Sequence, residues 1–207
     1  ILIVIGTYFF IRTELTEINL VDESELQMPL KVFTIDGELI GEFGEIKRRA
    51  TDYEDIPVNI KNAFLAAEDD NFFNHQGISY KGLIRSFIRC LSSDGCEGGG
   101  GTITMQVVRG YLLTRDQTVI RKIKEIYLAL ELEGNISKEE IFELYVNRIF
   151  LGNRSYGIEA AANTYFDKGL EDLTISESAA IAALAQLPSR VNPVKDPRRT
   201  IQRRNWI

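Results

Sequence analysis

Residues 66–77, AAEDDNFFNHQG, place three acids, two phenylalanines and the only histidine of the chain directly after an apolar run. In that run Ile60, Phe64 and Ala67 recur at helical spacing, which predicts a core-facing helix with the acids at its C-terminal end. Negative charge is unfavourable there, because the helix dipole puts partial negative charge at the same end. Packing against an aromatic ring would raise the proton affinity of a carboxylate such as Glu68, as a general base requires. A solvated acidic helix end is the alternative interpretation.

Length and composition bound the possible functions. The chain has 207 residues and a mass of 23.5 kDa, enough for one sizeable hydrophobic core. A composition of 44% hydrophobic and 26% charged residues is that of an ordinary globular protein. The net charge of -6 and pI near 5.0 argue against nucleic acid as a partner. Cys90 and Cys96 match no metal-binding or CxxC pattern, and a disulfide or two free thiols fit them equally.

The order of local patterns predicts a mainly helical protein with a small β element near its start. Asp36-Gly37 lies between two β-rich runs within residues 30–43, which predicts a hairpin. Capping boxes begin helices after Ser137 and Thr174. These elements surround the acidic stretch on both sides.

A further helix is predicted over residues 117–133, closed by Gly134-Asn135 as its stop. Ile123 and Leu130 are among the apolar positions expected to face the core. The same helix carries Arg121 four residues before Glu125, a spacing that on a surface helix gives only a weak ion pair.

Two segments suggest a membrane. Residues 1–11, ILIVIGTYFFI, are apolar but shorter than the roughly 20 residues that span a bilayer, so they are interpreted as the end of a transmembrane anchor. A buried element of the domain is the alternative. The acidic residues that follow favour an extracytoplasmic side for the domain. Residues 79–91 form a basic amphipathic segment, which fits either a surface helix or a membrane interface.

A glycine-rich connector, residues 92–101, leads into a polar helix. Its glycines permit a close approach of the backbone to a ligand. Thr102, Gln106 and Arg109 then fall on one face of the predicted helix.

Together these motifs resemble the peptidoglycan glycosyltransferase (transglycosylase) domain of bifunctional class A penicillin-binding proteins and of monofunctional transglycosylases. The resemblance runs from about residue 57 to residue 192, with the motifs in the family's order. The matching stretches are EDDNFFNHQG at 68–77, GGTITMQVVR at 100–109, RKIKE at 121–125, KEEIFELYVNRIFLG at 138–152 and GIEAAANTYF at 157–166.

The resemblance implies a mainly α fold with a lysozyme-like helical lobe and a smaller membrane-proximal lobe, besides the N-terminal hairpin. Residues 12–54 would be the juxtamembrane segment and hairpin, and residues 55–195 the glycosyltransferase domain. Within it, residues 78–101 would form the mobile membrane-side lobe. Residues 196–207 would begin a linker to a C-terminal transpeptidase domain, whose S-x-x-K and K-T-G motifs this chain does not contain.

The implied activity is polymerisation of lipid II into glycan strands with release of undecaprenyl pyrophosphate. Glu68 would be the general base, and Glu125 the second essential acid, either organising basic neighbours or holding a divalent cation, Mg²⁺ or Mn²⁺. No organic cofactor is implied. A leaving pyrophosphate requires cations where charge develops. The candidate substrate-binding side chains are Thr104, Gln106, Arg109, Arg121, Lys122 and Lys124.

Three residues are expected to structure the loop around the base: Asp69, Phe72 and His75. His75 is assigned a structural role rather than a catalytic one. The implied partners are lipid II, the growing glycan strand, the membrane surface and other cell-wall synthesis proteins. The implied location is the extracytoplasmic, periplasmic face of the bacterial cytoplasmic membrane, on a single-pass anchor.

Two positions depart from the family pattern, because Gly101 replaces the usual Ser and Met105 the usual first Gln. If those polar groups contact substrate, this chain lacks a donor at each position. Two other functions compete: a lysozyme-like glycan-cleaving enzyme, which also uses one buried Glu, and an inactive wall-binding module of the same fold, for which these departures leave room. A hydrolase has no need of the basic RKIKE cluster.

Overall fold

The computed structural model describes residues 30–33, 36, 39–43, 50–82, 84, 101–111, 119–188 and 191–207. The predicted anchor end at 1–11, both cysteines and most of the predicted lobe at 78–101 lie outside these residues. None of the helices in the described ranges has the length and apolar character needed to cross a bilayer.

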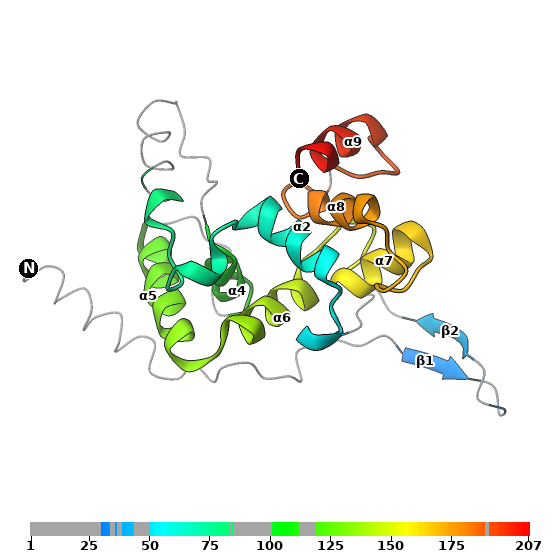
Figure 1. Ribbon diagram of the computed structural model, residues 1–207. Helices are drawn as coiled ribbons and strands as arrows, with labels where there is room; N and C mark the ends of the chain where they lie inside the picture. The colour runs from blue at the N-terminus through cyan, green and yellow to red at the C-terminus, as the bar shows by residue number, and fades with distance from the viewer. Residues whose placement is uncertain are drawn as a thin grey trace, which may run out of the picture.

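The described part is mainly helical, as predicted, and Figure 1 shows the helices gathered into one body with the strand pair at its side. The α-helices are α2 (Val58–Glu68), α4 (Ile103–Tyr111), α5 (Val119–Asn135), α6 (Lys138–Arg148), α7 (Ile158–Phe166), α8 (Ile175–Leu184) and α9 (Pro197–Trp206). Two 3-10 helices, η2 (Tyr53–Asp55) and η3 (Phe72–Asn74), flank α2.

The predicted β element is present as an antiparallel pair, β1 (Leu30–Phe33) and β2 (Leu39–Phe43), on either side of Asp36. Its register pairs Leu30 with Phe43 and Phe33 with Leu39, and it shifts between Val32 and Phe33. The predicted β element is therefore observed as two paired strands, while residues 34, 35, 37 and 38 of the predicted hairpin turn lie outside the described residues.

Two capping boxes begin helices where the sequence predicts them. The Ser137 hydroxyl accepts a hydrogen bond from the Glu140 backbone N–H, and the Glu140 carboxylate accepts one from Ser137 N–H. Thr174 and Glu177 repeat the arrangement at the start of α8. Each box satisfies two backbone donors that a helix start otherwise leaves unpaired.

The core lies where α2, α4, α6 and α8 meet. α2 packs on α8, α4 packs on both α5 and α6, and α9 packs on α8. The largest buried side chains include Phe64 of α2 and Phe142 of α6, and neither is exposed at all. The segment 196–207, expected to begin a linker, thus contains a helix folded against the body.

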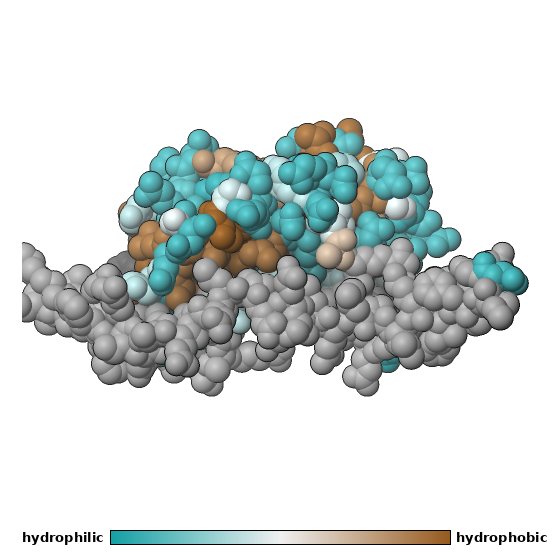
Figure 2. Space-filling view, turned by 90° about the horizontal axis from the view of Figure 1, so that it is seen from below, coloured by the Kyte–Doolittle hydropathy of each residue, from teal (hydrophilic) through white to brown (hydrophobic). Residues whose placement is uncertain are grey.

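The orientation of α5 corrects one expectation. Ile123 and Leu130 were expected to face the core, but they are 39% and 45% exposed. The buried face instead carries Glu125, Leu128 and Leu132. α5 has apolar residues on more than one face, so periodicity alone does not choose between them. Figure 2 shows apolar surface gathered on the side of the molecule where α5 lies. The helix also continues through Gly134 to Asn135 instead of stopping before them.

Candidate active site

The last residue of α2 is Glu68, and α4 supplies its partner. Glu68 is half-buried, and its Oε2 accepts a hydrogen bond from Gln106 Nε2 at 2.9 Å. Burial raises the pKa of Glu68 above its ordinary value, although the Gln106 hydrogen bond and the nearby charge of Arg203 act the other way. The Asp69 carboxylate adds a smaller upward effect. A carboxylate with a raised proton affinity and a free oxygen suits a general base.

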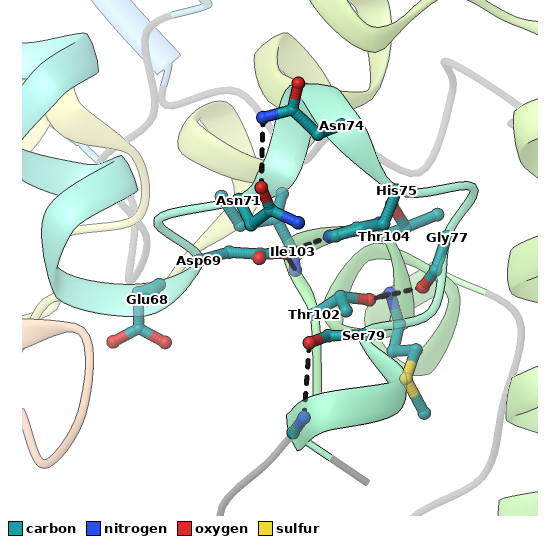
Figure 3. A network of polar contacts seen from close by, with 12 residues as sticks. Glu68, Asp69, Asn71, Asn74, His75, Gly77, Ser79, Thr102, Ile103 and Thr104 are labelled. Carbon is teal, nitrogen blue, oxygen red and sulfur yellow. Dashed lines mark hydrogen bonds and ion pairs between the residues drawn. The ribbon is translucent and has the colours of Figure 1, made fainter.

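The residues after Glu68 form a loop fixed by Asp69. Asp69 Oδ2 contacts His75 Nε2 at 2.9 Å and accepts a hydrogen bond from the Ile103 backbone N–H at 3.1 Å. One carboxylate oxygen thereby joins the loop to the start of α4. Figure 3 shows Glu68 at the end of α2, with its carboxylate pointing away from this network. Asp69 and His75 thus contact each other within this loop, and their loop-structuring role stays a prediction.

A second link to α4 comes from Thr102, which is 2% exposed. Its hydroxyl donates to Gly77 O at 2.6 Å and accepts from the Met105 backbone N–H at 3.2 Å. The same oxygen therefore caps α4 and holds the end of the loop. Gly77 has a φ of +77°, and a Cβ added to it would lie 2.7 Å from Ala129 O of α5. Only glycine fits this close approach without moving the backbone.

Phe72 of the loop packs into the hydrophobic core. It is 1% exposed, its ring meets Phe73 and His75 edge-on, and Lys138 Nζ lies 4.3 Å from its centroid. Such aromatic and cation–π contacts stabilise a loop that has little regular backbone hydrogen bonding.

Glu125 lies at the centre of a cationic cluster on α4 and α5. Its side chain is fully buried, and three cations contact it: Arg109 Nη2 at 2.7 Å, Arg121 Nη1 at 3.0 Å and Lys122 Nζ at 2.9 Å. Burial alone would raise the pKa of Glu125, but hydrogen bonds from Arg109 and Lys122 outweigh it, and the pKa is lowered. Glu125 is therefore a fixed negative charge that holds three cations together, two of them partly exposed.

The two acids are connected through one helix. Gln106, which contacts Glu68, and Arg109, which contacts Glu125, lie three residues apart on α4. Side chains at this spacing are neighbours on a helix surface, with a rise of about 4.5 Å between them. Neighbouring side chains of α4 therefore link Glu68 at the end of α2 to the cationic cluster around Glu125 of α5.

The remaining predicted residues are placed differently. Thr104 is fully buried, and its hydroxyl donates to Glu133 Oε1 at 2.5 Å, so the structure gives it a core contact and does not bring it to the exposed edge of the site. Gln106 lies at Glu68 rather than in the cationic cluster. Lys124 is half-buried on α5 and is not one of the three cations that hold Glu125.

The structure accounts for both departures in the second motif. Met105 is fully buried in the core, where an apolar side chain fills space and a Gln would need a buried partner. Gly101 lies against the cluster, since a Cβ there would be 3.1 Å from Arg109 Nη2 and 3.8 Å from Glu125 Oε1. The missing side chain leaves room for Arg109 to reach Glu125.

Sequence reasoning missed two neighbours of Glu68. Tyr145 of α6 is buried, and burial, followed by the charges of Glu68 and Asp69, raises the pKa of its hydroxyl well above the ordinary value. Arg203 of α9 donates to Ala67 O at 3.3 Å, from 136 positions away. Tyr145 lies within one of the matching stretches, 138–152, but was given no role at the site, and Arg203 lies beyond the stretch that carried the resemblance.

The residues around Glu125 do not fit a protein-held divalent cation. Both of its oxygens face cationic donors, and the described ranges contain no group of three or more His, Cys, Asp and Glu side chains that could hold a metal. Hard cations such as Mg²⁺ need several oxygen ligands, and three adjacent positive charges repel them. These residues thus give no support to the expected Mg²⁺ or Mn²⁺ at Glu125, which stays a prediction.

Comparison with known proteins decides the family. The model of the family described as Transglycosylase matches residues 36–207, most of the chain. The chain belongs to the transglycosylase family. The resemblance inferred from the motifs is thereby confirmed.

Several curated proteins and one solved structure are similar to this chain. The chain is 48% identical to Penicillin-binding protein 1A of Pseudomonas aeruginosa over 98% of its own length and 25% of that protein. It is 39% identical to Penicillin-binding protein 1A of Escherichia coli over 98% of its length and 24% of that protein. The crystal structure of Penicillin-Binding Protein 1A from Haemophilus influenzae matches with 34% identity and a TM-score of 0.46, covering 87% of this chain and 17% of that one. The chain spans about a quarter of the length of these curated relatives.

Proposed function

We propose that this transglycosylase domain is a peptidoglycan glycosyltransferase that polymerises lipid II into glycan strands. The observation that carries the proposal is made on α4, where Gln106 contacts a carboxylate of raised pKa, Glu68, and Arg109 contacts the buried Glu125 at the centre of the cationic cluster. Glycosyl transfer from a pyrophosphate donor needs both parts, a base for the acceptor hydroxyl and positive charge for the leaving group.

In the proposed reaction, Glu68 takes the proton from the sugar hydroxyl of the acceptor. The resulting oxygen attacks the anomeric carbon of the donor and forms the new glycosidic bond with inversion. The bond from that carbon to the pyrophosphate breaks, and its electron pair leaves with undecaprenyl pyrophosphate. Arg109, Arg121 and Lys122 stabilise the charge that develops on the phosphates.

Glu125 would act through these cations. Like charges packed together repel, and a buried carboxylate between them lowers that cost while keeping the guanidinium groups oriented. If a divalent cation accompanies the substrate, it would supply further charge at the phosphates, and the residues described here would still do the orienting. Gln106 would orient the Glu68 carboxylate.

The alternatives receive no support from the geometry. A glycan-cleaving enzyme expels no pyrophosphate, so it has no need of the three cations that contact Glu125. An inactive module has no requirement for a cationic cluster beside a carboxylate of raised pKa.

The proposal extends to the surroundings of the domain. We expect a lysozyme-like helical lobe to be joined by a smaller membrane-side lobe at 78–101, and the domain to lie on the extracytoplasmic side of the cytoplasmic membrane. The expected partners are lipid II, the growing glycan strand, the membrane surface and other cell-wall synthesis proteins.

The test is polymerisation of labelled lipid II in detergent by the chain and by Glu68→Gln. The amide keeps the shape and can still accept from Gln106, but it cannot take a proton. We expect polymer from the chain and at least a 100-fold lower rate from the variant, the usual scale of general-base catalysis. Asp70→Asn is the matched control, because Asp70 is an exposed carboxylate two residues away. Equal rates for Glu68→Gln and Asp70→Asn would refute Glu68 as the base.

A further inference from the structure

A basic residue of the last helix reaches the end of α2. Arg203 of α9 is half-buried, and its Nη2 donates to Ala67 O, the carbonyl of the residue just before Glu68. The guanidinium also stacks on the Trp206 ring one turn later, 4.2 Å from the centroid. Two contacts therefore fix its position at this helix end.

The contact places positive charge where the backbone needs it. The last carbonyls of a helix lack intrahelical partners and carry partial negative charge. The acidic residues Glu68 and Asp69 add full negative charges at the same end. A cation there offsets both, and Arg holds its charge at any pH at which the protein is folded.

The position of the Arg203 guanidinium does not pair all of its own hydrogen-bond donors. Its Nε is buried and finds no acceptor among the described residues. A buried donor left unpaired costs free energy. The placement of this guanidinium thus serves the end of α2 at some cost to its own hydrogen bonding.

We propose that Arg203 is a positioning residue for the general base, capping the end of α2 and keeping the Glu68 carboxylate ionised and oriented. The proposal rests on the proposed function of Glu68. Arg203 bonds to the neighbouring backbone carbonyl, which leaves the carboxylate to Gln106 and to the acceptor.

The charged and titratable groups around Glu68 determine how replacement of Arg203 should change the pKa of Glu68. Asp69 at the end of α2 raises the pKa of Glu68, while Gln106 of α4 and Arg203 of α9 lower it. Tyr145 of α6 also faces the acids, and its own pKa is raised, so it stays neutral in the working range. Arg203 is thus the cation identified as acting on Glu68 among the residues that the structure describes.

The experiment compares Arg203→Met and Arg203→Lys with the control Arg204→Met. Arg204 lies next to Arg203 on α9, but its guanidinium donates only to the Asn205 side chain at 2.7 and 3.0 Å among the contacts described. Lipid II polymerisation is measured from pH 5 to pH 9. The Glu68 carboxyl is titrated in parallel by NMR of the isotope-labelled chain.

For Arg203→Met we expect the acid limb of the rate profile and the Glu68 titration to move together to higher pH. At the acid end the rate should be several-fold lower, and it should recover as the pH rises. Arg203→Lys should lie close to the parent, and Arg204→Met should match it. If Arg203→Met does not fold, Arg203→Gln replaces it with the same expectation.

A rate that falls equally at every pH, with the Glu68 titration unchanged, would overturn the proposal and leave a structural role only. Superimposable profiles would overturn it as well. The titration needs no activity, so it separates the two proposals. Activity retained by Glu68→Gln would refute the base, while an unchanged titration in Arg203→Met would refute the positioning role.

Discussion

At the residue scale, the two acids of the site differ in what surrounds them. Glu68 has one neutral donor, Gln106, and burial raises its pKa. Glu125 has three cationic donors, and its pKa is lowered despite complete burial. The pKa of the same side chain is thus shifted up at one position by burial and down at the other by cationic neighbours.

Glu68→Gln should abolish polymerisation and raise thermal stability. A carboxyl whose folded-state pKa is raised costs stability at every pH above that value, and the amide removes the cost. At pH 7 to 8 the melting temperature should increase by about 2–4 °C, the shift that roughly 1 kcal/mol gives at this chain length. Scanning calorimetry checks this, and the gain should disappear at acid pH. A lower melting temperature at neutral pH would contradict it.

Glu125→Gln should have the opposite effect on stability. It leaves three cations together without their counter-charge, and a loss of about 1–3 kcal/mol is expected. Because the pKa of Glu125 is lowered, its contribution is present above the unfolded value of 4.5 and is lost as the pH falls through the folded value. Urea unfolding at pH 7 and at pH 3 measures both. The difference in the free energy of unfolding between parent and variant should shrink at pH 3. An equal difference at both pH values would contradict an origin in the charge of Glu125.

At the element scale, the loop from Glu68 to Gly77 is held between α2, α4 and α5 by very few atoms. Asp69 Oδ2 and the Thr102 hydroxyl join it to α4, and Gly77 lets it approach the α5 backbone. We expect loss of any one of these contacts to move Glu68 relative to the cationic cluster.

Gly77→Ala and Gly134→Ala should change stability in opposite directions. At Gly77 the positive φ and a Cβ 2.7 Å from Ala129 O force a backbone shift, with an expected loss of about 2–4 kcal/mol. At Gly134 of α5 an added Cβ meets nothing within 4 Å, and alanine should gain about 0.5–1 kcal/mol through its helix propensity. The midpoints of denaturant unfolding of the parent and of both variants measure these changes in stability. Equal effects would mean that the close approach at Gly77 is unimportant.

Sequence patterns predicted where helices begin more accurately than which face of a helix is buried. Capping chemistry is local, so Ser137 and Thr174 marked helix starts correctly. The buried face of α5 could not be chosen, because its partner α4 lies elsewhere in the chain and covers the Glu125 side. The motifs identified the acids, but the burial of Thr104 and Met105 depends on long-range packing. Arg203 joins the site only through tertiary structure.

At the scale of the whole molecule, the C-terminal helix belongs to the same body as the site. α9 packs on α8, which in turn packs on α2, and Ile207 is packed against the core. The predicted domain end at residue 195 would therefore remove a helix that contacts α2, the helix that carries Glu68.

A chain ending at residue 195 should be less stable and less active at acid pH. It loses the α8–α9 packing and Arg203 together, and a melting temperature lower by about 5 °C or more is expected, corresponding to roughly 2 kcal/mol. Arg203→Met in the full chain is the control that isolates the charge. A truncated chain with the melting temperature and pH profile of the parent would show that α9 is dispensable.

The bond between Arg203 and Ala67 joins positions 136 residues apart. Chains emerge from the ribosome from the N-terminus, at about 5–20 residues per second, so α2 is made several seconds before its partner in α9. Contacts of such long range also form late, since the chain between them must first be ordered. The surroundings of Glu68 are therefore complete only after α9 has been synthesised and has packed on α8.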